Sequence, residues 1–292
     1  MKTSLQHLPD HKQANIHAAV EIIQDEFDQV IGSAQGKKKH SRIVLIILFG
    51  SYAKGTWVDD VANGYISDYD LLVVLNNNDL VEDYKIWHTA EERIQRKLKA
   101  PINLLVHTHK EINDKLQQGH YFFTDIKAEG IQLYQYSNTQ LTTPGKLSKE
   151  EAQKIAEKHY AQWFESANSF SIDYGHCMAR KDYKKAAFEL HQAVERYYGC
   201  FLLVFTNYLP KSHDLKRLRH LAIQQDQTLS TVFAQDTKFN RRCFELLKRA
   251  YIEARYSEHY EITDEALLWL AKQTEILRDL TQKLCLHKIE VL

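Results

Sequence analysis

The chain has 292 residues, a length that suits about two domains. Its 38 basic residues balance its 38 acidic residues, which excludes a globally basic nucleic-acid binder, and a hydrophobic content of 44% excludes a mainly disordered chain. The longest apolar runs, Ile43–Phe49 and residues 200–205, are far shorter than the roughly 20 residues of a membrane-spanning helix. Because residues 1–20 lack a signal-peptide pattern and the four cysteines form no paired motif, we predict a cytoplasmic protein with reduced cysteines.

The first half of the chain alternates helical and extended patterns. Apolar residues at helical spacing predict helices, and short runs rich in β-branched residues predict buried strands. The expected elements are, in chain order, a helix over residues 16–31, a strand over 43–49, a strand over 70–75, a helix over 86–98, a strand over 102–106 and a strand over 130–134. Thr108 and Glu111 have the spacing of a capping box, which predicts a further helix after the third strand. We expect a small mixed sheet with helices mainly on one side.

The second half of the chain is helical throughout. Residues 142–145 (Thr-Thr-Pro-Gly) have the composition of a linker, and beyond them apolar residues recur at helical spacing in five segments. Thr263 has the position of an N-cap for the last of these segments. We therefore predict an α/β (α+β) domain at residues 1–141, a linker at 142–147 and an all-α helical bundle at 148–292.

The first strand ends in a turn whose residues suit a phosphate group. Residues 50–55 read Gly-Ser-Tyr-Ala-Lys-Gly. Gly50 lets the backbone approach a ligand closely, and Ser51 offers a hydroxyl and an N–H at the start of a short helix. Lys54 would supply a further positive charge. The alternative is a plain turn, since Gly-Ser at the end of a strand is common.

The second strand begins with two acidic residues, in the segment Ser-Asp-Tyr-Asp-Leu-Leu at residues 67–72. Side chains two positions apart in a strand point to the same face, so Asp68 and Asp70 should project together, about 7 Å apart. Two like charges at this spacing favour a bound cation, and Mg²⁺ commonly binds one or two carboxylates plus substrate phosphates. The alternative is a strand that begins with two solvated aspartates.

The order of strand, Gly-Ser, short helix, loop and Asp-x-Asp at the start of an apolar strand resembles the nucleotidyltransferase superfamily of DNA polymerase β. It is most similar to the small branch of minimal nucleotidyltransferases, which includes the aminoglycoside nucleotidyltransferases. The resemblance implies that Gly50 and Ser51 hold the nucleotide phosphates and that Asp68 and Asp70 bind Mg²⁺. It also implies transfer of a nucleotidyl group from an NTP, with ATP the expected donor, to a hydroxyl of a small molecule or a protein.

The sequence departs from the superfamily pattern in two places. Sixteen residues, 52–67, separate the Gly-Ser pair from Asp68, and Asp59, Asp60, Asn63 and Gly64 predict a surface loop in the added length. The superfamily usually carries a third carboxylate on the next strand, where the best-aligned residue here is Asn103. An amide is a poor proton acceptor, so His107 could serve as the base, an acid such as Glu111 or Asp125 could complete the site, or the domain could bind nucleotide without catalysis.

The helical half is similar to HEPN domains fused to minimal nucleotidyltransferases, through residues 182–193 and 246–256, and residues 119–131 fit the same fusion. Some HEPN domains are metal-independent ribonucleases with an Arg-x(4–6)-His motif completed by dimerisation. The resemblance offers Arg255 and His259 for this role, although only three residues separate them, and implies RNA as a partner and a homodimer through the bundle. The alternative is a favourable cation at the end of a helix and an exposed histidine.

Two further histidine features predict structure rather than chemistry. His107 and His109 have the spacing of two metal ligands on one strand face, but no third ligand is close in sequence, so we expect no zinc site. His191 lies beside the apolar stripe of the second bundle helix. We expect it to be a core histidine whose hydrogen bonds are satisfied.

Overall fold

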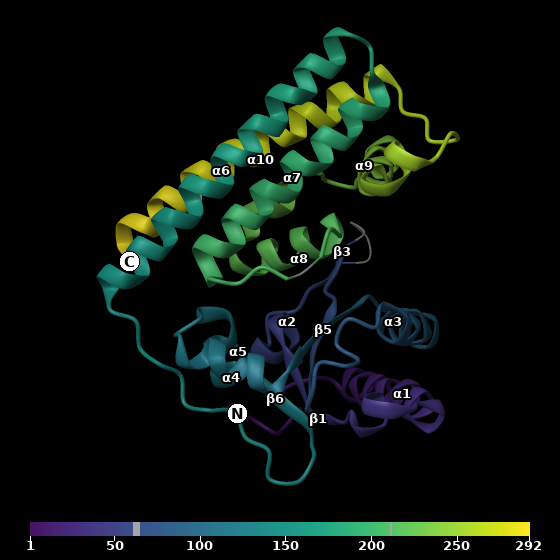
Figure 1. The fold of residues 1–292 in the computed structure, drawn as a ribbon, viewed down its shortest axis with the longest axis vertical. Helices are drawn as coiled ribbons and strands as arrows, with labels where there is room; N and C mark the ends of the chain where they lie inside the picture. Colours follow the sequence, from purple (N-terminus) through teal and green to yellow (C-terminus); the bar gives the residue numbers. More distant parts are fainter. Residues whose placement is uncertain (61–64, 211) are drawn as a thin grey trace. The chain divides into compact units, whose positions relative to one another are not determined.

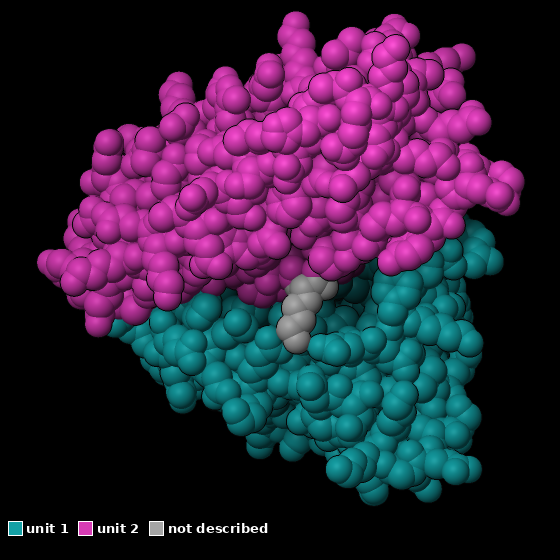
Figure 2. Space-filling model, turned by 45° about the horizontal axis from the view of Figure 1, so that its top comes forward, with its two compact units in different colours: residues 1–146 teal, residues 147–292 magenta. Residues whose placement is uncertain are grey.

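The computed structural model describes residues 1–60, 65–210 and 212–292. The chain forms two compact units, Met1–Lys146 and Leu147–Leu292, which Figure 2 distinguishes by colour. Among the described residues, none of the helices combines the length and the apolar content that crossing a membrane requires.

The first unit is a small mixed sheet with helices between its strands (Figure 1). Its elements are α1 (Asp10–Ser33), the 3₁₀ helix η1 (Gly36–His40), β1 (Ile43–Phe49), α2 (Gly50–Lys54), β2 (Asp59–Asp60), β3 (Tyr65–Ile66), β4 (Tyr69–Leu75), α3 (Tyr84–Leu98), β5 (Ile102–Thr108), α4 (His109–Gln117), α5 (Tyr121–Glu129) and β6 (Ile131–Gln135).

Four strands form the main sheet in the order β5-β4-β1-β6. Strand β1 pairs antiparallel with β4 and with β6, whereas β4 and β5 run parallel. The predicted strands over residues 43–49 and 70–75 are therefore neighbours, which confirms the expected mixed sheet. Because β1 runs opposite to β4 and β5, its C-terminal end lies at the edge where those two strands begin.

Helices cover both faces of this sheet, so the expectation that they pack mainly on one side is wrong. One face forms a core with α1 and α3 that contains Ile23, Val73 and Trp87. On the opposite face, Phe122 of α5 packs edge-on against Phe49 with ring centroids 5.7 Å apart. Every residue of β1 and of β4 is buried, as expected for strands that are covered on two sides.

The sequence pattern missed α5 but predicted the start of α4 correctly. Helix α5 has nine residues and follows α4 after a short turn, so its apolar stripe is too brief to stand out. At α4, the Thr108 hydroxyl caps the helix by accepting from Glu111 N at 3.0 Å. The Glu111 carboxylate does not complete the capping box, because it pairs with the His107 ring at 3.0 Å.

The long segment between the Gly-Ser pair and Asp68 contains a short hairpin. Strands β2 and β3 pair antiparallel, with Asp59 opposite Ile66 and Asp60 opposite Tyr65. The base of the segment is tied by Ser67, whose hydroxyl accepts from Val58 N at 2.9 Å. Of the residues predicted to form a loop there, Asp59 and Asp60 instead form β2, and Asn63 and Gly64 lie outside the described residues.

The second unit is a helical bundle, as predicted. Its elements are α6 (Lys149–Ala179), α7 (Tyr183–Thr206), α8 (Leu215–Gln225), the 3₁₀ helix η2 (Gln227–Thr231), α9 (Lys238–Tyr256) and α10 (Asp264–Val291). Helix α7 contacts α6, α8, α9 and α10 and so forms the centre of the bundle (Figure 1). The sequence patterns predicted all five α-helices but not η2.

Local signals explain where the long bundle helices begin. Ser148 and Glu151 form a complete capping box at α6, and the Thr263 hydroxyl accepts from Ala266 N at the start of α10. All four cysteines are buried free thiols, so they contribute to packing as expected for reduced core cysteines.

Candidate functional site

The sheet register brings the predicted site residues to one edge of the first unit. Phe49, the last residue of β1, pairs with Asp70 of β4, and Asp70 pairs in turn with Asn103 of β5. Gly50 and Ser51 follow Phe49 directly. The Gly-Ser turn, the aspartate pair and Asn103 therefore meet at the same edge, although up to 53 positions separate them in the numbering.

The turn after β1 needs glycine at both of its ends. Gly50 has φ +71°, a left-handed conformation that L side chains rarely adopt. Gly55 has φ +80° and ends α2 as a left-handed C-cap. Between them, the Ser51 hydroxyl is buried and has no hydrogen-bond partner among the residues that the structure describes. A buried hydroxyl without a partner costs free energy, which is characteristic of a group kept for a ligand.

Asp70 is completely buried, and one of its partners is an amide. The Asn103 Nδ2 donates to Asp70 Oδ1 at 3.0 Å, and Asn103 itself is only 4% exposed. Asp68 is half-buried and lies just before β4 begins at Tyr69. The two aspartates therefore differ in exposure, with Asp70 held by the neighbouring strand and Asp68 closer to the solvent.

The donor set at this edge fits a hard divalent cation that arrives with phosphates. Two carboxylates are the protein ligands that Mg²⁺ commonly takes, with phosphate oxygens and water completing its six positions. Across residues 1–60, 65–210 and 212–292, no group of three or more His, Cys, Asp or Glu side chains could hold a metal ion by itself. A metal held by Asp68 and Asp70 would thus depend on the nucleotide for further ligands.

His107 lies too far along β5 to act as the base at the aspartates. It pairs with Val74, four residues beyond the Asp70–Asn103 pair, which is about 13 Å along a strand. Its Nδ1 lies 3.0 Å from the Glu111 carboxylate. Glu111 is therefore held beside His107, at a similar distance from the aspartates. A catalytic base must reach the proton within a hydrogen bond or one water, which excludes His107.

The other sequence-derived residues of this unit lie at its surface. Lys54 Nζ forms an exposed ion pair of 3.0 Å with Glu129 of α5. Asp125 is an exposed residue of α5. His109 Nε2 contacts the Gln140 carbonyl at 2.9 Å while His107 contacts Glu111, so the two histidines do not form the pair of metal ligands that their spacing permits.

No pattern along the chain indicated Lys12, a buried lysine of α1 whose ammonium donates to the Tyr52 hydroxyl at 3.1 Å. Tyr52 directly follows Ser51 in the Gly-Ser turn. A lysine near the start of a helix is ordinarily read as solvated, and its partner lies 40 residues away, so the contact depends on the tertiary fold.

Comparison with protein families assigns both units. Residues 34–138 match the model for the polymerase beta nucleotidyltransferase family, and residues 160–284 match the model for the HEPN domain. The chain joins a polymerase β-type nucleotidyltransferase domain to a HEPN domain. No match was found among curated proteins. The resemblance drawn from the Gly-Ser and Asp-x-Asp segments is thereby confirmed.

The HEPN domain presents Arg255 and His259 in different surroundings. The Arg255 guanidinium lies over the rings of Phe188, Tyr251 and Tyr256, at 4.8 to 4.9 Å from each ring centroid. His259 is beyond the end of α9, and its side chain is 88% exposed with Glu258 3.6 Å away. The ring contacts account for Arg255 through packing, and an exposed histidine of this kind is commonplace.

His191 is buried as predicted, but its hydrogen bonds are not all satisfied. Its Nε2 atom has no partner in the described part of the chain, while its Nδ1 lies 3.8 Å from the Glu195 carboxylate. Burial, with the nearby charges of His213 and Arg255 adding to it, lowers the pKa of His191 to about 3. The imidazole is therefore neutral at physiological pH.

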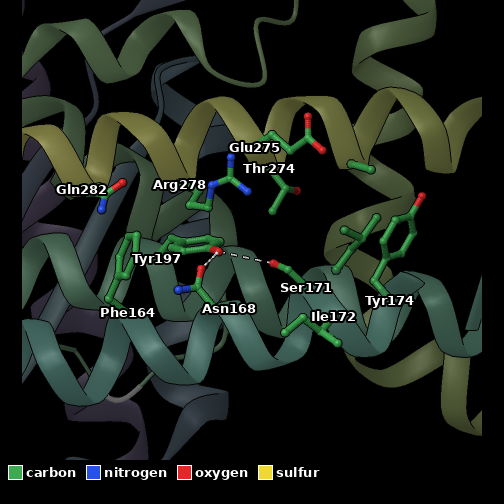
Figure 3. A pocket seen from close by; sticks show the side chains of 12 residues that line it. Phe164, Asn168, Ser171, Ile172, Tyr174, Tyr197, Thr274, Glu275, Arg278 and Gln282 are labelled. Carbon is green, nitrogen blue, oxygen red and sulfur yellow. Dashed lines mark hydrogen bonds between the residues drawn. The ribbon is translucent and has the colours of Figure 1, made fainter. Parts of the chain in front are cut away.

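A pocket of about 530 Å³ opens between α6, α7 and α10 of the HEPN domain (Figure 3). Tyr197 of α7 lies at its floor, where the hydroxyl donates to Asn168 Oδ1 at 2.7 Å and lies 3.4 Å from the Ser171 hydroxyl. Arg278 and Glu275 of α10 line the opposite wall, as Figure 3 shows. Its size is that of a small-molecule site, but the arginine is already paired with Asp279 at 2.8 Å.

Proposed function

We propose that the first domain transfers a nucleotidyl group from an NTP, with ATP the expected donor, to a hydroxyl of a small molecule or a protein, and that the reaction depends on Mg²⁺. The observation that carries the proposal is the buried Ser51 hydroxyl, which has no partner within the described parts of the chain and lies at the sheet edge that Asp70 also occupies. The match to the polymerase beta nucleotidyltransferase family supports the same chemistry.

In this proposal each residue at the sheet edge has a distinct role. The Gly50 backbone and the Ser51 hydroxyl hold the triphosphate, and Asp68 and Asp70 hold Mg²⁺. When bound, Mg²⁺ would neutralise the charge on the phosphate oxygens and orient the leaving pyrophosphate. Lys54 would leave its exposed pair with Glu129 to contact a phosphate, at little cost because such surface pairs contribute about 0–1 kcal/mol.

A second candidate function is nucleotide binding without transfer, and the Asn103–Asp70 contact favours it. The amide donates to the carboxylate at 3.0 Å and so offers Asp70 an N–H where a third carboxylate would offer an oxygen. Neither His107 nor Glu111 lies close enough to replace that group. In this case the domain would bind MgATP and regulate the HEPN domain rather than modify an acceptor.

One pair of measurements separates these functions. Calorimetry with ATP and Mg²⁺ should show binding to the wild type and little binding to the Asp68→Asn/Asp70→Asn variant; equal binding by both proteins would remove the site assignment. The wild type is then incubated with α-labelled ATP and a panel of hydroxyl acceptors. Transfer of label supports the transferase, whereas binding without any transfer supports the regulatory module.

A further inference from the structure

Lys12 is a buried lysine near the start of α1, in contact with the candidate nucleotide site from behind. Lys12 is only 7% exposed, and a lysine is seldom buried to this degree unless its ammonium group is paired. The Nζ atom donates to the Tyr52 hydroxyl at 3.1 Å. It also lies 5.4 Å from the centroid of the Tyr52 ring and 5.8 Å from that of Tyr69, within the range of cation–π attraction.

The two tyrosine rings form one stacked unit beneath this ammonium. Their centroids are 4.3 Å apart at an interplanar angle of 25°, and both residues are almost completely buried. Trp57 stacks on the Tyr52 ring at 5.7 Å, and Asn15 of α1 donates to the Tyr69 hydroxyl at 3.3 Å. Helix α1 therefore holds both rings from its first turns.

The positions of these two tyrosines in the chain connect the Lys12 contact to the candidate nucleotide site. Tyr52 directly follows Ser51 in the turn that would hold phosphate, and Tyr69 lies between Asp68 and Asp70. Side chains alternate along a strand, so Tyr69 points to the face opposite Asp70 and toward α1. The stacked rings thus connect the phosphate side of the site to its metal side, behind the surface that a nucleotide would touch.

We propose that Lys12 is a positioning residue that clamps Tyr52 to Tyr69 and thereby fixes the Gly-Ser turn relative to the aspartate pair. Lys12, Tyr52 and Tyr69 are called the tyrosine clamp below. The proposal rests on the proposed function, because the distance that the clamp sets matters only if phosphates and metal occupy the two halves together. Lys12 itself touches neither nucleotide nor metal in this arrangement.

The clamp is tested first without nucleotide. Hydrogen exchange is compared between wild type and Lys12→Met, which keeps an unbranched side chain of similar length but removes the charge. We expect faster exchange, by roughly fivefold or more, in both segments 50–56 and 68–72. His17→Met puts the same side chain on the exposed face of α1 and should change neither segment. Faster exchange confined to α1 would overturn the clamp, whether or not the protein binds ATP.

The second measurement is the factor by which Mg²⁺ increases the affinity for ATP. Loss of the clamp should reduce this factor by roughly five- to tenfold in Lys12→Met, while the affinity for ATP in EDTA stays close to that of the wild type. Lys12→Arg, which keeps a cation over the rings, should restore most of the factor. A variant that weakens ATP binding equally with and without Mg²⁺ would show that Lys12 only supports the fold. A wild type without any ATP binding would contradict the proposed function, and hydrogen exchange alone would then decide the clamp.

Discussion

The side-chain amide of Asn103 donates a hydrogen bond of 3.0 Å to the carboxylate of Asp70, across two parallel strands and in a fully buried setting. Hydrogen bonds to charged groups contribute about 1.5–3 kcal/mol, so the amide holds Asp70 in one orientation. It also supplies a donor where related enzymes, by the resemblance described above, carry a third carboxylate. The contact therefore stabilises the site while removing a group that could accept a proton.

A carboxylate at position 103 should lower the stability of the protein and raise its transferase activity. In EDTA, Asn103→Asp places a second buried negative charge against Asp70 and should lower the free energy of unfolding by about 1–3 kcal/mol. Mg²⁺ and ATP should recover that loss. If the missing base limits the reaction, label transfer from α-labelled ATP should rise by about 10²-fold.

The matched control for this substitution is Asn78→Asp, because Asn78 is exposed in the turn after β4. It adds the same charge away from the site and should leave both stability and transfer unchanged. If the Asn103→Asp variant gains affinity for Mg²⁺ but transfers no label from ATP, the regulatory module is supported. No change in either stability or metal affinity would contradict the buried contact itself.

The Ser51 hydroxyl should matter for binding but not for folding. Because the hydroxyl has no partner in residues 1–60, 65–210 and 212–292, Ser51→Ala removes no hydrogen bond described there, and the free energy of unfolding should stay within about 0.5 kcal/mol of the wild-type value or rise slightly. The affinity for MgATP should fall roughly tenfold, the effect of losing about 1.5 kcal/mol from one contact to a charged phosphate.

Calorimetry and thermal unfolding on the same samples check this separation. Thr281 in α10 offers a matched control, since its buried hydroxyl also lacks a partner among the described residues. Thr281→Val should likewise leave folding intact and should not change MgATP binding. A Ser51→Ala protein that unfolds much more easily would show that the hydroxyl serves the fold and not a ligand.

The apolar patterns predicted the frame of the site almost to the residue. Strand β1 coincides with the predicted run at 43–49, and β4 begins one residue before the predicted 70–75, because a continuous β-branched run can be buried on both faces only within a sheet. Asn103 was aligned with the third carboxylate of the superfamily through the resemblance alone, and the strand register places it opposite Asp70. The local sequence therefore predicted the strands whose ends form the candidate site.

The contacts that the patterns missed all depend on tertiary packing. Its position in the sequence predicts a solvated side chain for Lys12, whereas in the fold its ammonium lies over the rings of Tyr52 and Tyr69. The Glu111 carboxylate was expected to complete a capping box, but the His107 ring competes for it at 3.0 Å. A single sequence shows how residues are spaced along the chain, whereas these contacts depend on which partner the fold brings closer.

Lys54 should contribute to nucleotide binding through charge alone. Its pair with Glu129 is exposed, so breaking it costs little and Lys54→Met should leave stability unchanged. The affinity for MgATP should fall roughly three- to tenfold at low salt, and the difference from wild type should shrink as the salt concentration rises. Glu129→Gln should have the opposite effect, because it frees the lysine. Equal affinities for all three proteins at low salt would remove Lys54 from the site.

The HEPN domain should lose stability as the pH falls, because of His191. Burial lowers the pKa of His191 to about 3, against about 6.5 in the unfolded chain. Between these values the unfolded state binds the additional proton, so the stability that the neutral imidazole supports is complete above about pH 6.5 and is lost as the pH falls toward 3. At pH 5 the expected loss is about 2 kcal/mol.

Thermal unfolding between pH 7.5 and 4.5 measures this dependence. His191→Gln removes the titrating group, and although it will change stability at every pH, its slope against pH should be shallower than that of the wild type by about one proton. His259→Gln is the matched control, since that side chain is 88% exposed and should leave the slope unchanged. If both variants kept the wild-type slope, His191 would not be the group that takes up the proton on unfolding, and its burial in the neutral form would be contradicted.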